Sequence, residues 1–165
     1  MPYLYNERKY SREELFDLIE RMFFNMQLIK KIVAEKKEEF NVFLSSNKLD
    51  AIGGGHSNVS DPTFQKVVNM INEIKYIELP HNAKDGEHII YYPQKWIDNY
   101  NAVFIEYMDN QKVSRILYSR YAQQQTATKI IQNEKLQKNK YYNLITEVLN
   151  FAINVAIQQK LITVV

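Results

Sequence analysis

The segment TATKIIQNEKLQKNKYYNLITEVL, from Thr126 to Leu149, has the hydrophobic spacing of two helices joined by a tight turn. Ile130 and Ile131 supply apolar positions in the first helix, and Leu136 falls in the turn. Apolar residues then recur every three or four positions, which is the spacing of one face of an α-helix. A first helix that crosses a second in this way is typical of a helix-turn-helix. The apolar positions of the second helix are Tyr141, Leu144, Ile145, Val148 and Leu149.

Polar residues fill the other positions of the second helix and should face away from the first. A lysine side chain suits a phosphate or a guanine edge, and an asparagine can form two hydrogen bonds with adenine. We expect the lysines to neutralise phosphates, and Asn139 and Asn143 to touch bases. The predicted DNA-binding residues are Lys129, Lys138, Asn139, Lys140, Tyr142, Asn143 and Thr146.

Three positions depart from the usual helix-turn-helix pattern. Ile131 stands where a small residue is common because the two helices touch there. Glu134 falls at an inward site, and Lys135 takes the turn position where glycine is common. The motif is therefore degenerate, and a turn shifted by a residue or two stays open. An ordinary helical hairpin with a solvated basic face is the alternative interpretation.

The composition, with 45% hydrophobic and 24% charged residues, is that of a folded soluble chain. A length of 165 residues allows one domain with a modest core, or a small domain plus an arm. The chain has no cysteine, which excludes disulfides and thiolate metal sites and agrees with a cytoplasmic location. We expect neither a signal peptide nor a membrane partner, because no stretch reaches the roughly 18 apolar residues of a membrane span.

The net charge of +2 is unevenly distributed along the chain. Residues 110–165 contain eight basic and two acidic residues, a net charge of +6, so the remainder carries 2 − 6 = −4. Such asymmetry is expected when one half of a protein meets a polyanion and the other half meets protein. The basic half contains the predicted helix-turn-helix.

A long helix is predicted near the N-terminus. Ser11 and Glu14 form a capping-box pattern, and a heptad stripe of apolar residues follows. Two interpretations of the stripe remain open: it is buried in the chain's own domain, or residues 11–40 pair with a second copy in a homodimer. The stripe comprises Leu15, Ile19, Met22, Met26, Ile29 and Val33.

Glycine, serine and asparagine dominate the segment from Leu44 to Asp61, which predicts a loop or hinge. Its three consecutive glycines lack the Gly-Lys-Ser/Thr sequence of a phosphate-binding loop. A further helix is expected from Pro62, with Phe64 to Ile74 supplying core positions. Residues 87–93, EHIIYYP, favour a short strand, whose partner could be Leu161 to Val165, although extended coil is equally open.

The segment Gly53 to Thr63, GGGHSNVSDPT, resembles the glycine-rich and SDPT-type region of phage late-gene transcription activators of the RinA and ArpU type. In those proteins a helix with an Arg-Tyr pair precedes a sigma-factor-like helix-turn-helix with a Tyr-Tyr pair. Arg120-Tyr121 and Tyr141-Tyr142 stand in that order here. The resemblance implies an all-helical activator that binds a promoter region and acts with the host RNA polymerase.

No pattern indicates an enzyme, a cofactor or a metal site. His56, His81 and His88 lack the spacing of metal ligands on one element, and no nucleophile motif is present. We expect Trp96 and most tyrosines to be core or rim residues. Arg115 and Arg120 are expected to contact DNA or polymerase, unless Arg120 is paired within the fold.

The predicted fold is mainly α, with a helical arm (1–44), a glycine-rich hinge (45–61) and a helical domain (62–165) whose sigma region 4-like helix-turn-helix lies at about 126–149. One short two-stranded β element is allowed. The predicted function is a phage or prophage regulator that binds double-stranded DNA. The alternatives are a DNA-packaging assembly factor of the small-terminase type and a protein-interaction module with a degenerate helix-turn-helix.

Overall fold

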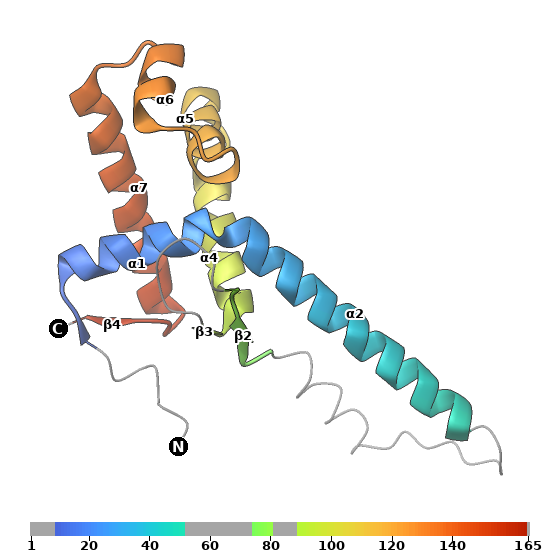
Figure 1. The fold of residues 1–165 in the computed structure, drawn as a ribbon. Coiled ribbons are helices and arrows are strands. Elements are labelled where there is room, and N and C mark those ends of the chain that lie inside the picture. The colour runs from blue at the N-terminus through green and yellow to red at the C-terminus, as the bar shows by residue number, and fades with distance from the viewer. Residues whose placement is uncertain (1–8, 52–73, 81–88, 165) are drawn as a thin grey trace.

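The computed structural model describes residues 9–51, 74–80 and 89–164, and this part of the chain is mainly helical (Figure 1). Two pairs of very short strands accompany the helices. The elements are β1 (Lys9–Tyr10), α1 (Arg12–Phe24), α2 (Met26–Ala51), β2 (Tyr76–Glu78), β3 (Ile89–Tyr91), α4 (Pro93–Glu106), α5 (Gln111–Leu117), the π-helical turn η2 (Tyr118–Ala122), α6 (Ala127–Asn133), α7 (Lys138–Gln158) and β4 (Thr163–Val164).

The N-terminal helix begins at the predicted capping box. The backbone N–H of Glu14 donates to Ser11 Oγ at 3.3 Å, and the backbone N–H of Ser11 donates to Glu14 Oε2 at 2.7 Å. These two bonds satisfy donors that the first turn of a helix leaves free. Every residue of the heptad stripe from Leu15 to Val33 is buried, so the inward face of this region was predicted correctly.

The stripe does not belong to one continuous helix, as the sequence suggested, because the helix breaks at Asn25. The Asn25 side-chain amide donates to the carbonyl oxygen of Arg21 at 3.0 Å, and its backbone N–H also bonds Arg21. Asparagine favours such helix ends because its side chain competes for backbone partners. The break sends α1 and α2 in different directions (Figure 1), so that α1 contacts α7 while α2 contacts α4.

From Tyr10 to Val33 the N-terminal region is part of the main core, and beyond Val33 helix α2 extends away from the other helices (Figure 1). Tyr10 and the stripe residues belong to the same buried cluster as residues 77–162. The chain's own helices therefore cover the stripe, which favours the intramolecular interpretation. The predicted hinge also differs in part, because α2 continues as helix to Ala51. Residues 52–61 of that hinge, the GGGHSNVSDPT segment and the helix expected from Pro62 to residue 73 lie outside the described residues.

Both predicted strand segments form strands, but they do not pair with each other. β3 pairs antiparallel with β2, with Ile77 opposite Ile90, and β4 pairs in parallel with β1 at the N-terminus. Ile77 and Ile90 are both buried, so this pairing covers one side of the core. The parallel β1–β4 pair brings Lys9 and Tyr10 beside Thr163 and Val164 (Figure 1).

Helices α4 and α7 pack against each other at the centre of the molecule (Figure 1). Trp96, Tyr100 and Val103 line the inward side of α4, in agreement with the prediction that Trp96 is a core residue. The buried Asn99 side chain donates from Nδ2 to the carbonyl oxygen of Ala152 in α7 at 2.9 Å. No helix of the described part is long and apolar enough to cross a membrane.

Candidate nucleic-acid interface

Helix α6 begins where the sequence predicts the first helix of the motif. Thr126 is the N-cap, and its Oγ1 accepts from the backbone N–H of Lys129 at 3.3 Å. Ile130 is buried, and Ile131 is half-buried against the core. The large Ile131 side chain is tolerated here because it remains at the edge of the core.

The turn after α6 lies at the predicted place and ends the helix with a left-handed residue. Leu136 N–H donates to the carbonyl oxygen of Ile131 at 3.0 Å, and Lys135 N–H donates to that of Gln132 at 3.3 Å. This pair of bonds is the Schellman motif, which places one residue in the αL region. That residue is Lys135, with φ of 51°. The turn therefore has the left-handed position that usually favours glycine, and Lys135 occupies it.

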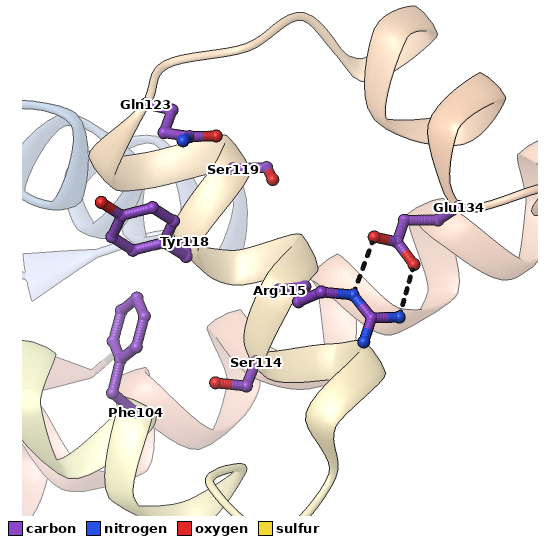
Figure 2. Close-up of a pocket in the computed structure, with 7 residues that line it drawn as sticks. All are labelled: Phe104, Ser114, Arg115, Tyr118, Ser119, Gln123 and Glu134. Carbon is purple, nitrogen blue, oxygen red and sulfur yellow. Dashed lines mark hydrogen bonds and ion pairs between the residues drawn. The ribbon is translucent and has the colours of Figure 1, made fainter.

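Glu134 is held by an ion pair with Arg115 of α5. Arg115 donates from Nε to Glu134 Oε1 at 3.2 Å and from Nη2 to Oε2 at 3.1 Å (Figure 2). The hydrogen bonds from Arg115 lower the pKa of Glu134, and the carboxylate in turn raises the pKa of Arg115. The unusual acid in the motif thus joins the turn to the preceding helix through a two-point contact.

Helix α7 divides cleanly into a buried and an exposed face. Tyr141, Ile145, Val148 and Leu149 are buried, and Leu144 is half-buried. All seven predicted contact residues are exposed: Lys129, Lys138, Asn139, Lys140, Tyr142, Asn143 and Thr146. Lys129 comes from the first turn of α6, and the other six come from the first three turns of α7. Six of the seven predicted residues therefore lie at the N-terminal end of α7, and Lys129 lies on the preceding helix.

The N-terminal end of α7 is basic and carries no acidic residue in its first turn. Its N-cap, Gln137, makes no capping hydrogen bond with its side chain. Lys138 and Lys140 lie in this turn, and within the described residues neither they nor Lys129 form an ion pair. The free backbone N–H groups and the helix dipole make this end electropositive, and the lysines add to it.

Arg120 belongs to η2, the element that precedes α6, and its side chain is paired within the fold. It donates from Nη1 to the Tyr141 hydroxyl at 2.8 Å and from Nε to Glu20 Oε1 at 3.1 Å. The Tyr121 hydroxyl also donates to Glu20 Oε1, at 3.2 Å. The guanidinium lies over the rings of Phe24, Tyr121 and Tyr141. Arg120 is thus a structural residue and does not form part of the exposed basic surface.

The environment of this cluster determines the protonation states of Arg120, Tyr121 and Tyr141. Burial works against the charged form of Arg120, but Tyr121, Glu20 and Tyr141 together raise its pKa. Burial raises the pKa of Tyr121 and of Tyr141. Arg120 therefore stays charged and both tyrosines stay neutral over the physiological pH range.

The sequence did not reveal the partner of Arg120, since 100 residues separate it from Glu20, nor the pairing of Arg115 with Glu134. Glu20 directly follows the buried Ile19 in α1. Because several other residues of this helix are charged and exposed, the sequence does not single out Glu20 as having a distant partner. His56, His81 and His88 lie outside the described residues.

No family model matches this chain, and no curated protein or solved structure matches it either.

Proposed function

We propose that this protein is a transcriptional regulator that binds double-stranded DNA with helices α6 and α7. The observation that carries the proposal is the exposed stripe Asn139, Tyr142, Asn143 and Thr146 along the start of α7. These residues follow the spacing i, i+3, i+4, i+7, which places them on one face of the helix. The opposite face is buried in the core, so the stripe is free to enter a groove.

The lysines beside this stripe support a polyanionic partner. Lys138 and Lys140 are the first and third residues of α7, where the helix dipole disfavours positive charge. Each lysine costs roughly 0.3–1 kcal/mol at such a position relative to an acidic residue. A phosphate at this end reverses the balance, because it meets both the lysines and the free backbone N–H groups.

The geometry suggests a division of roles among the exposed residues. Lys138 and Lys140 at the start of α7, together with Lys129 of α6, would neutralise phosphates, which sets the position of the protein on the duplex. Asn139 and Asn143 lie one turn apart and would reach base edges in the major groove. Tyr142 and Thr146 form the adjacent row, where apolar contacts with thymine methyl groups are favoured.

The resemblance to activators of the RinA and ArpU type indicates which kind of regulator the protein would be. It supports a phage or prophage late-gene activator that works in the bacterial cytoplasm beside the host RNA polymerase. The regulated promoter would then lie close to the gene itself, so upstream DNA from that neighbourhood is the first probe to use.

The test is a binding titration with the double substitution Lys138→Glu and Lys140→Glu. Affinity for duplex DNA should fall at least tenfold at low salt, because four units of charge change beside the phosphates. The thermal unfolding temperature should be retained or should rise, because acids are favoured at a helix N-terminus. Fluorescence anisotropy at two salt concentrations and a circular dichroism melt measure the two effects.

A matched control carries the same charge change on α2. Lys31 and Lys37 are exposed residues of that helix, which runs away from α6 and α7 (Figure 1). Lys31 pairs with Glu35 and Lys37 donates to Gln94, so the same circular dichroism melt confirms that this variant is folded. The variant Lys31→Glu, Lys37→Glu should bind DNA nearly as well as the parent protein. Equal losses in both double variants would show that affinity reports only net charge. Unchanged binding by the Lys138 and Lys140 variant would refute the proposed interface.

A further inference from the structure

An open pocket of about 430 Å³ lies beside the helix-turn-helix, outside the surface proposed for DNA (Figure 2). The end of α4, helix α5, the π-helical turn η2 and the turn after α6 all contribute to its walls. Its volume falls within the range of sites that bind small molecules. The lining residues are Phe104, Ser114, Arg115, Tyr118, Ser119, Gln123 and Glu134.

One side of the pocket is aromatic. Figure 2 shows the rings of Phe104 and Tyr118 on the same side of the pocket, away from Arg115 and Glu134. Tyr118 is 55% exposed despite its size, so a ligand that covered its ring would remove apolar surface from water. Tyr118 is the first residue of η2, where the Gln123 N–H bonds the Tyr118 carbonyl oxygen at 3.0 Å. Such π-helical turns occur often at binding sites.

The other side of the pocket carries a positive charge with unused hydrogen-bonding capacity. Arg115 uses Nε and Nη2 for Glu134, and its Nη1 has no partner among the described residues. Lys112 acts on the same carboxylate, so Arg115, Lys112 and Glu134 sum to a charge of +1. Ser114 and Ser119 add hydroxyl groups that make no side-chain hydrogen bond within the described part of the chain.

We propose that this pocket binds a planar aromatic molecule that carries one acidic group. The ring would lie against Tyr118 and Phe104, and the acidic group would accept a hydrogen bond from Arg115 Nη1. The two serine hydroxyls would bond polar atoms of the ring or of the acid. A single negative charge matches the local sum of +1, whereas a neutral aromatic leaves the Arg115 edge unused. This inference does not depend on DNA binding.

The test uses the full chain, labelled with ¹⁵N, and two probes with the same ring: indole-3-acetate and the neutral indole-3-acetamide. Indole-3-acetate should produce saturable amide shifts at residues 104, 114–119 and 123, with a dissociation constant of about 1 mM or lower. The acetamide should bind at least tenfold more weakly. The comparison isolates the acidic group, because the two probes differ only there.

Three variants locate the binding. Tyr118→Ala removes the exposed ring, and Arg115→Gln removes the charge; each should weaken indole-3-acetate binding at least tenfold. Tyr142→Ala removes an exposed ring of α7 that is not part of the pocket, and it should bind the probe like the parent protein. Circular dichroism confirms that each variant is folded. The proposal is overturned by non-saturating shifts, by equal binding of the two probes, or by undiminished binding to Tyr118→Ala.

Discussion

Lys135 holds a backbone conformation that its side chain disfavours. Its φ of 51° lies in the left-handed region, where a Cβ atom approaches the following carbonyl oxygen. Gln124 and Lys160 do the same after η2 and α7, with φ of 54° and 56°. All four glycines of the chain are elsewhere in the sequence. Three helix ends therefore carry a conformational cost that glycine would remove.

Replacing Lys135 with glycine should stabilise the protein. The substitution Lys135→Gly relieves the αL cost, partly offset by the greater freedom of glycine in the unfolded chain, for a net gain of about 0.5–1 kcal/mol. The measurement is the free energy of unfolding from urea titration. The turn bonds of Leu136 and Lys135 should persist, because they use only backbone atoms.

The variant Lys135→Ala separates backbone strain from charge. It removes the same positive charge but keeps the Cβ atom, so its unfolding free energy should remain near that of the parent protein. If alanine and glycine stabilised the chain equally, repulsion among the basic residues of the turn, and not the left-handed conformation, would be the cause.

Arg120 and Glu20 together connect three elements of the fold. Arg120 of η2 bonds Glu20 of α1 and Tyr141 of α7, so α7 is fixed to the N-terminal helix α1 through a chain of side chains. The side chains of Arg120 and Glu20 are only 14% and 26% exposed, which places the pair in a low-dielectric region. Removing one partner from such a pair leaves the other charge without compensation.

The substitution Glu20→Ala should therefore destabilise the protein by about 3 kcal/mol. Tyr141→Phe removes one hydrogen bond to a charged donor and should cost about 1.5 kcal/mol. Urea unfolding measures both values. In the Glu20→Ala background, Tyr141→Phe should cost a different amount than in the parent, because the two groups share Arg120. Strictly additive losses would contradict a connected network.

The elements whose faces repeat regularly were predictable from the sequence. The periodicity of α7 gave its buried and exposed faces, and the stripe from Leu15 to Val33 gave the inward face of α1 and α2. The break at Asn25 was not visible, because a stripe keeps its spacing through a one-residue interruption. The partner of β3 was also missed, since a strand of three residues carries too little pattern to specify its neighbour.

In the candidate site too, features set by helical periodicity were predictable from the sequence, and contacts between distant residues were not. The exposure of Lys138, Asn139 and Lys140 follows from their place on α7 and needs no tertiary knowledge. The pairing of Arg115 with Glu134 and of Arg120 with Glu20 depends on how helices pack, over separations of 19 and 100 residues. Charge patterns along one helix do not report such contacts, because they reveal only neighbours three or four residues apart.

One long helix joins the proposed DNA surface to the core of the molecule. The first turns of α7 carry the exposed polar stripe, while its later turns, including Ala152 and Ala156, pack against α4 and α1. The surface therefore cannot move as a separate unit without breaking contacts of the central helix pair. Global unfolding and loss of the DNA surface should occur together.

Alkaline pH should reveal how far the core depends on neutral tyrosines. Burial raises the pKa of Tyr100 to about 12 from an unfolded value of 10.0, and it also raises the pKa values of Tyr121 and Tyr141. Because the folded pKa is raised, the stability from these groups is complete below pH 10 and is lost as the pH rises towards 12. Unfolding is favoured in that window, since only the unfolded chain releases the protons readily.

A pH titration followed by tyrosinate absorbance and by circular dichroism tests this. The buried phenols of Tyr100, Tyr121 and Tyr141 should ionise in a step that coincides with the loss of the helical signal. Tyr100→Phe removes the ionisable group but keeps the ring contacts with Phe23 and Phe104, so its unfolding should move to higher pH. Complete ionisation of all tyrosines with the helical signal intact would mean that the phenols of α4, η2 and α7 are not buried together, and that the central helix pair is looser than its contacts require.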